Sequence, residues 1–156
     1  MVILKRGDSS DEGFQKLIKE LDKVLRSRYN QVQNQYDQYN KVDTIRNVVV
    51  AYIGEQPVGC GCFKKFDHSS VEIKRMFVSE DHRGKGIAES ILKELERWAK
   101  ELSYHHTVLE TGVKLPEAMR LYQKYHYVIT ENYGQYIGME NSVCMRKDLG
   151  EAPYET

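Results

Sequence analysis

The sequence lacks an excess of charge of either sign. Over 156 residues, 23 lysine and arginine residues balance 23 aspartate and glutamate residues. Proteins that coat a nucleic-acid backbone or an anionic membrane carry a positive excess or a clustered basic surface, and no basic, aromatic motif of an RNA-binding sheet is present. We therefore expect no nucleic-acid or membrane partner, and any phosphate binding must be local.

Cysteine and long apolar runs are also scarce. Cys60, Cys62 and Cys144 are too few, and odd in number, to form a secreted disulfide framework. Cys60 and Cys62 share one face of an expected strand, but no fourth ligand for a structural zinc ion is apparent, so we expect free thiols. No run approaches the ~20 apolar residues that cross a bilayer. We expect a cytoplasmic protein.

The remaining composition fits one α/β domain spanning residues 1–156, because 40% of the residues are apolar. The first elements expected are a strand at 2–5 and a helix beyond Asp11, a good capping residue. The stripe of this helix is Phe14, Leu17, Ile18, Leu21 and Leu25. Residues 28–43, rich in tyrosine and glutamine, fit either a helix or a loop over a pocket.

Hydrophobic patterning predicts the rest of the chain. Strands are expected at 47–53, 58–66, 71–78, 106–110, 127–130 and 142–147, with Gly54 turning the first hairpin. A helix at 116–124 begins with proline. The clearest helix, 87–102, has an apolar stripe that includes Trp98 and Leu102. Six charged residues of this helix are expected to face solvent, namely Glu89, Lys93, Glu94, Glu96, Arg97 and Lys100.

A glycine-containing loop, RGKGIA at 83–88, joins the strand at 71–78 to this helix. The first amides of a helix have no intrahelical partners, and the helix dipole is positive there, so such a loop can bind phosphate. Glycines 84 and 86 allow a ligand to approach the backbone closely. The spacing matches neither the Walker nor the Rossmann motif. The alternative is a helix start with a flexible lead-in and solvated charges.

Three positions of this loop match a known signature. Arg83, Gly86 and Ala88 fit Q/R-x-x-G-x-G/A, and the loop thereby resembles that of the GNAT superfamily of N-acetyltransferases. The resemblance extends over the strand at 71–78, LETG at 109–112 and EAMRLYQKYHY at 117–127, about a third of the chain. In the last stretch Ala118, Leu121 and Tyr122 fit the family pattern A-x-x-L-Y-x-x-x-G-F, whereas His126 and Tyr127 replace its glycine and phenylalanine.

The resemblance implies a fold and a cosubstrate. The fold is a mixed, mostly antiparallel, twisted sheet of about six or seven strands with about four helices, in which two central parallel strands splay apart. The resemblance places acetyl-CoA in the cleft that opens between these two strands. The implied enzyme is an N-acetyltransferase without a metal ion that moves the acetyl group to a primary amine by direct attack in a ternary complex.

The resemblance also assigns roles to residues. The Met76 amide holds the thioester oxygen and the Val78 amide holds the pantetheine arm, because alternate amides of a strand point the same way. Phe77 lies between them and faces oppositely. Glu72 is a candidate general base acting through water, and Tyr122 is a candidate acid for the leaving thiolate. The pyrophosphate is expected on the loop residues Arg83, Gly84, Lys85, Gly86, Ile87 and Ala88.

Each catalytic role has a simpler alternative. Glu72 could be an exposed strand carboxylate paired with Lys74 or Arg75, and Tyr122 could pack under its helix with its hydroxyl bonded to the backbone. His105 and His106 are adjacent, so in a strand they point to opposite faces and do not form a metal site easily. Trp98 is expected in the core.

The acceptor and the assembly are the least determined. Two tyrosine-rich groups could bind a small polar amine: Tyr29, Tyr36, Asp37 and Tyr39, and Tyr133, Gln135, Tyr136 and Asn141. We expect a small-molecule acceptor. The alternatives are a protein or peptide acceptor and a non-catalytic acetyl-CoA sensor. The resemblance is also compatible with a homodimer.

Overall fold

The computed structural model describes residues 1–29, 44–113 and 115–150. Seven strands form one sheet in the order β1-β2-β3-β4-β5-β7-β6. The β4–β5 pair is parallel, and the mixed, mostly antiparallel sheet that was predicted is confirmed. The strands are β1 (Val2–Gly7), β2 (Asn47–Ile53), β3 (Gln56–Lys65), β4 (Ser70–Val78), β5 (His106–Gly112), β6 (Val128–Thr130) and β7 (Ser142–Asp148).

Three α-helices lie within the described residues: α1 (Glu12–Tyr29), α3 (Ile87–Glu101) and α4 (Pro116–Lys124). Two short 3₁₀ turns, η2 (Glu80–His82) and η3 (Gly134–Tyr136), were not predicted. The helix-or-loop alternatives for the tyrosine-rich segment fall outside the described residues from position 30 to 43. Among the described helices, none combines the length and the hydropathy of a membrane span.

The chain divides into two compact units. The first comprises Met1–Lys64 and Lys74–Leu95, and the second comprises Lys65–Ile73 and Glu96–Thr156. The division falls inside β4 and inside α3, so each of these elements contributes to both units. The two units are described separately below.

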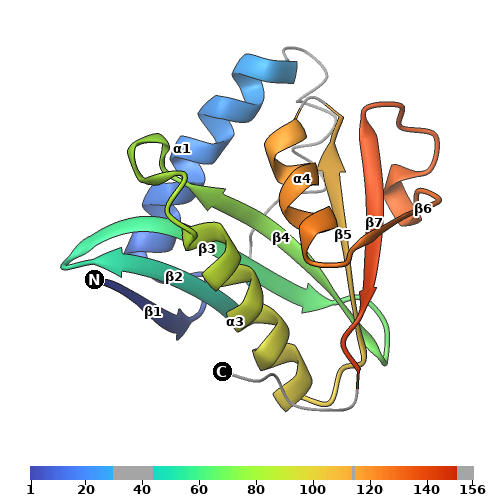
Figure 1. The fold of residues 1–156 in the computed structure, drawn as a ribbon, viewed down its shortest axis with the longest axis horizontal. Helices are drawn as coiled ribbons and strands as arrows, with labels where there is room; N and C mark the ends of the chain where they lie inside the picture. The colour runs from blue at the N-terminus through green and yellow to red at the C-terminus, as the bar shows by residue number, and fades with distance from the viewer. Residues whose placement is uncertain (30–43, 114, 151–156) are drawn as a thin grey trace. The chain divides into compact units, whose positions relative to one another are not determined.

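In the first unit, α1 packs on one face of the antiparallel strands β1, β2 and β3 (Figure 1). The helix begins where predicted, because the Asp11 carboxylate accepts a hydrogen bond of 2.9 Å from the Phe14 amide. The core under α1 is formed by the buried side chains Phe14, Leu17, Leu21, Ile45, Val48, Val50, Cys60, Cys62 and Phe77.

The other face of β3 carries two glycines that let α3 approach closely. A β carbon at Gly61 would lie 2.5 Å from the Met76 sulfur and 2.9 Å from Leu95 Cδ1. At Gly59 it would lie 3.0 Å from Ile91 Cδ1. Only glycine fits such a gap without displacing the helix.

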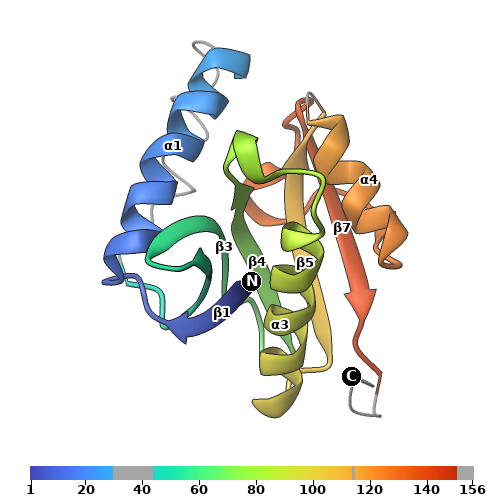
Figure 2. The same cartoon turned by 60° about the vertical axis from the view of Figure 1, so that its left-hand side comes forward.

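In the second unit, β5 is central. Its first half pairs in parallel with β4, from Ser70↔His106 to Ile73↔Leu109, and its whole length pairs antiparallel with β7. Helix α4 lies beside β5 (Figure 2). It has the predicted bounds, with Pro116 in its first turn. The ladder between β4 and β5 covers only the first four residues of β4, although both strands continue.

Two expectations for α3 are wrong. Glu96 was expected in solvent, but only 1% of it is exposed. Its carboxylate accepts hydrogen bonds from the Tyr127 hydroxyl (2.7 Å) and from Lys147 Nζ (2.8 Å). Position 96 is four residues after the buried Leu92, so helical geometry places it on the inner face despite its charge. Leu102, expected on the apolar stripe, lies beyond the end of the helix and is 49% exposed.

Candidate active site

The predicted site residues divide between the two units. The first unit contains the amides of Met76 and Val78 and the whole of the loop at 83–88, and the second contains Glu72 and Tyr122. Both groups share β4, because Glu72 lies four residues before Met76 on that strand.

One hydrogen bond fixes the direction of the β4 amides. The Ser79 amide donates to the Val58 carbonyl of β3 at 2.9 Å. In an antiparallel ladder every second residue bonds to the neighbouring strand, so the Phe77 amide also points to β3. The amides of Met76 and Val78 therefore point away from β3. The Val78 carbonyl does likewise, since it accepts a hydrogen bond of 2.9 Å from Arg83 Nε.

The loop at 83–88 presents its backbone to solvent. Gly84 and Gly86 both have φ of +78°, a left-handed conformation that suits glycine, and no atom lies within 4 Å of where a β carbon would be. Gly84, Lys85 and Gly86 are exposed, whereas Ile87, 3% exposed, anchors the first turn of α3. This arrangement of open amides at a helix start fits a diphosphate.

Arg83 is partly engaged by its own strand. Its Nε donates to the Val78 carbonyl, and its guanidinium carbon lies 5.7 Å from the centre of the Phe77 ring. These contacts hold the side chain at the end of β4, beside the loop. Both Arg83 and Lys85 are exposed to solvent.

Glu72 is buried, which removes the alternative of an exposed strand carboxylate. Only 3% of it is exposed, and its carboxylate accepts a hydrogen bond of 2.8 Å from the Tyr133 hydroxyl. Burial, followed by the charge of Glu72, raises the pKa of Tyr133 well above its usual value. The tyrosine therefore remains protonated and continues to donate. Its ring also stands edge-on to Phe66, with the ring centres 4.9 Å apart.

A second carboxylate, Glu110 of β5, was not singled out from the sequence. It accepts a hydrogen bond of 2.8 Å from the Ser142 hydroxyl of β7. Burial first, and then the charges of Glu110 and Glu72, raise the pKa of Tyr136. Burial is also the main cause that raises the pKa of Cys144 to about 11, and the charges of Glu110 and Glu72 add to it. Both carboxylates therefore act on one cluster of side chains. The β5–β7 register, which the sequence does not reveal, places Glu110 opposite Cys144 and so beside this cluster.

The loop between β6 and β7 is fixed by a residue that sequence reasoning missed. Asn132 Nδ2 lies 3.1 Å from each of the carbonyl oxygens of Tyr136, Met139 and Ser142. Tyr136 is 1% exposed and stands edge-on to Tyr133, with ring centres 5.7 Å apart. An asparagine in a loop has no periodic signal, so the pattern could not identify it.

Tyr122 lies on α4 and is 6% exposed. Its ring stands edge-on to that of Tyr127, with centres 5.6 Å apart. Burial, followed by the charge of Glu110, raises the pKa of Tyr122. The hydroxyl is therefore protonated at neutral pH, and it is better suited to donating a hydrogen bond to an anion than to acting as a strong acid.

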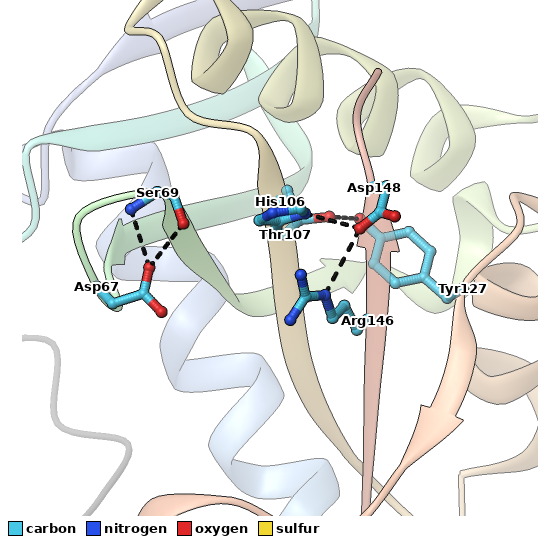
Figure 3. A network of polar contacts seen from close by, with 7 residues as sticks. All are labelled: Asp67, Ser69, His106, Thr107, Tyr127, Arg146 and Asp148. Carbon is cyan, nitrogen blue, oxygen red and sulfur yellow. Dashed lines mark hydrogen bonds and ion pairs between the residues drawn. The ribbon is translucent and has the colours of Figure 1, made fainter. Parts of the chain in front are cut away.

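Tyr127 is held by the strands beneath it. Its hydroxyl lies 2.7 Å from the Thr107 hydroxyl and donates to Glu96. Figure 3 draws Tyr127 and Thr107 among their polar neighbours. The phenylalanine of the family pattern could not make these bonds. Tyr127 is thus part of a buried polar network and supports the ring of Tyr122.

The adjacent histidines do not share a ligand. His106 Nδ1 lies 2.7 Å from Asp148 Oδ1, which is also 3.6 Å from Arg146 Nε (Figure 3). The ring centres of His105 and His106 are 6.3 Å apart. Across the described ranges, no group of three or more histidine, cysteine, aspartate or glutamate side chains is placed to hold a metal ion.

Comparisons with known proteins agree with this geometry. A model of the acetyltransferase (GNAT) family matches residues 14–127. YsnE, an uncharacterized N-acetyltransferase of Bacillus subtilis, is 34% identical over 101 residues, which are 64% of this chain and 67% of that protein. A Klebsiella pneumoniae structure described as an acyl-CoA N-acyltransferase superposes with a TM-score of 0.80 at 26% identity, covering 96% of this chain and 99% of that one.

A GNAT family acetyltransferase of Elizabethkingia anophelis, solved with acetyl-CoA bound, has the same fold. Its TM-score is 0.66 at 19% identity, over 94% of this chain and 97% of that one. The family model covers well over half of the sequence, and the chain accordingly belongs to the GNAT family of acetyltransferases, which makes it an acyltransferase that uses acetyl-CoA.

Proposed function

We propose that this enzyme acetylates the primary amine of a small polar molecule, by direct attack of the amine on acetyl-CoA in a ternary complex. The observation that carries the proposal is the buried carboxylate of Glu72, held by the Tyr133 hydroxyl. This carboxylate lies on β4, four residues before Met76, where a base could take a proton from an amine that attacks the thioester.

Glu72 would accept a proton from the amine. An ammonium group has no lone pair, so it must lose a proton before or during attack on the thioester carbon. Glu72 would take this proton, directly or through water. The hydrogen bond from Tyr133 limits rotation of the Glu72 side chain and so fixes the position of the carboxylate.

The backbone of β4 would bind the acetyl-CoA. The Met76 amide points away from β3 and would donate to the thioester oxygen, which gains negative charge as the amine attacks. The Val78 amide, with the same direction, would bind the pantetheine arm. The Arg83 amide donates to the Glu80 carbonyl at 3.3 Å, so the amides from 84 to 88 would bind the pyrophosphate, with the side chains of Arg83 and Lys85 adding positive charge.

Tyr122 would assist departure of coenzyme A. When the carbon–sulfur bond breaks, the sulfur carries the electron pair and a negative charge. The Tyr122 hydroxyl, which is protonated because burial raises its pKa, would donate a hydrogen bond to this sulfur. This hydrogen bond would stabilise the negative charge on the leaving sulfur.

The side chains around Glu72 favour a cationic acceptor of modest size. Glu72 and Glu110 supply two negative charges, while Phe66 and the half-buried Tyr133 supply aromatic surface. Carboxylates and ring faces both attract ammonium groups. A small aliphatic or sugar-borne amine meets these requirements.

An acceptor screen tests the proposal. The protein is incubated with acetyl-CoA and either small amines (aliphatic diamines, amino sugars, amino acid amides) or peptides with free N-termini and lysines, and products are identified by mass spectrometry. We expect acetylated small amines, and a loss of turnover of about a hundredfold in Glu72→Gln.

Two results would contradict the proposal. Acetylation confined to peptides would identify a protein acceptor. Binding of acetyl-CoA without turnover on any amine would indicate a sensor. Glu72→Gln is a matched variant, because glutamine keeps the shape of the side chain and still accepts a hydrogen bond from Tyr133.

A further inference from the structure

β4 changes its hydrogen-bonding register along its length. The Ser70 carbonyl accepts hydrogen bonds from the amides of Phe66 (2.9 Å) and Asp67 (3.2 Å), and the Ser79 amide, just beyond β4, donates to the Val58 carbonyl at 2.9 Å. Nine residue steps, an odd number, separate Ser70 from Ser79, whereas the hydrogen-bonded residues of a regular antiparallel strand recur at every second position. Arg75, whose φ is +59°, lies in this span. The odd number requires one extra residue, which makes a β-bulge.

The bulge decides which amides of β4 are free. In an antiparallel ladder, hydrogen-bonded residues alternate along the strand. Counting in steps of two from Ser70 without a bulge would direct the amides of Met76 and Val78 at β3. With the extra residue, Phe77 and Ser79 take those positions instead. The amides of Met76 and Val78 are available to a ligand only in this shifted register.

Two buried thiols of β3 bond to the carbonyls at the bulge. Cys62 Sγ donates to the Lys74 carbonyl at 3.3 Å, and Cys60 Sγ donates to the Arg75 carbonyl at 3.4 Å. Neither cysteine is exposed. Burial raises the pKa of the Cys60 thiol well above its usual value, so it keeps its proton and can donate.

The backbone at the bulge needs such restraint. A φ of +59° is unfavourable for a residue with a β carbon. One restraint is the ion pair between Arg75 and Asp22 of α1, 2.7 Å long, which fixes the side chain. The thiols act on the backbone itself, at both carbonyls beside the strained position.

We propose that Cys60 and Cys62 are positioning residues for acetyl-CoA: by donating to the carbonyls of Lys74 and Arg75, their thiols hold the register of β4 in which the Met76 and Val78 amides are free. The contribution to acetyl-CoA binding rests on the proposed function. The thiol–carbonyl bonds and the register do not, so they are tested separately.

The first experiment needs no substrate. Infrared spectroscopy of the S–H stretch reports hydrogen bonding, because donation lowers its frequency. Bands are assigned with Cys60→Ala, Cys62→Ala and, as a control in the other unit, Cys144→Ala. We expect the bands lost in the first two variants to lie below the frequency of a free thiol. Bands at the free-thiol frequency would overturn the proposal whatever the enzyme acetylates.

The second experiment separates donation from packing. Valine replaces the thiol with apolar volume and no donor, whereas serine keeps a donor. We expect Cys60→Val/Cys62→Val to raise KM for acetyl-CoA about fivefold, with KM for the amine unchanged. Cys60→Ser/Cys62→Ser should keep the wild-type KM for acetyl-CoA, even where burial of the hydroxyl lowers its Tm.

Two outcomes of the kinetic comparison count against the proposal. One is a wild-type KM for acetyl-CoA in the valine variant. The other is a rise in KM that is equal in the valine and serine variants, because packing would then be responsible. If the wild-type protein shows no turnover, the proposed function fails, and the infrared bands alone decide whether the thiols hold the bulge.

Discussion

His126 occupies a left-handed backbone position, with φ of +75°. This is the position at which the family pattern has glycine, the residue that adopts a left-handed conformation most readily. A β carbon makes this conformation unfavourable by about 1–2 kcal/mol. A local hydrogen bond offsets this unfavourable free energy: the Tyr127 amide donates to the Tyr122 carbonyl at 3.0 Å and closes the end of α4.

His126→Gly should therefore stabilise the protein. We expect the free energy of unfolding to rise by about 0.5–1 kcal/mol, the relief of strain exceeding the added entropy of the unfolded chain. Denaturant unfolding measures the change. His105→Gly is the control, because His105 has no left-handed conformation to relieve. His105→Gly should lower the free energy of unfolding. An equal loss of stability in both variants would contradict the expected relief of strain at His126.

Tyr122→Phe should lower kcat by at least about tenfold. The substitution removes the hydroxyl that would donate to the leaving sulfur, and the edge-on contact with Tyr127 remains. Steady-state kinetics measure the change. Tyr104→Phe, in the turn after α3, is the control and should have wild-type kcat. A Tyr122→Phe enzyme with nearly unchanged kcat would assign this tyrosine to packing.

The residues of the site were predictable in part. Glu72 and the loop residues carry local signals, namely a motif and a fixed spacing from it. No local signal predicts the burial of Glu96 or the position of Glu110. Both depend on partners distant in sequence, namely Lys147 for Glu96 and Ser142 for Glu110. Residue type alone predicts solvent exposure for a glutamate, and only the partner overrides it.

At the scale of elements, Gly61 sets the distance between β3 and α3. Gly61→Ala should lower the free energy of unfolding by about 1–3 kcal/mol, because the new methyl group would overlap Met76 and Leu95. Thermal or denaturant unfolding measures the loss.

The control is Gly7→Ala at the end of β1, where no atom lies within 4 Å of the added carbon. It should change the free energy of unfolding by less than about 0.5 kcal/mol. A Gly61→Ala protein as stable as Gly7→Ala would mean that α3 shifts freely.

The elements themselves followed from pattern, but their register did not. Helix α4 and strand β2 have the predicted bounds because proline, glycine and periodicity are local signals. The expected alternation of the β4 amides was read from the strand alone. Which of the two alternate sets is free depends on the bulge at Arg75 and on pairing with β3, which are not encoded in the spacing of the strand.

At the scale of the whole molecule, acetyl-CoA should stabilise the fold. A ligand that binds only the native state, at 100 times its Kd, adds ~2.7 kcal/mol to the free energy of unfolding. For a chain of this size the Tm should rise by about 5–10 °C. Differential scanning fluorimetry measures the shift.

Gly86→Asp should abolish the shift, because aspartate brings a negative charge and an unfavourable left-handed conformation to the phosphate loop. Gly54→Asp is the matched control. Gly54 also has a positive φ, of 61°, and open space around it, but it lies in the β2–β3 turn. This variant should keep the shift. Stabilisation that survived in Gly86→Asp would place the diphosphate elsewhere.

The three buried cysteines allow the opening of each unit to be followed over time. Cys60 and Cys62 belong to one unit and Cys144 to the other, and none is accessible in the native state. An alkylating reagent can therefore modify each thiol only when its surroundings open. Peptide mass spectrometry after brief exposure to iodoacetamide would time the opening of each unit in a single sample, with no label added beforehand.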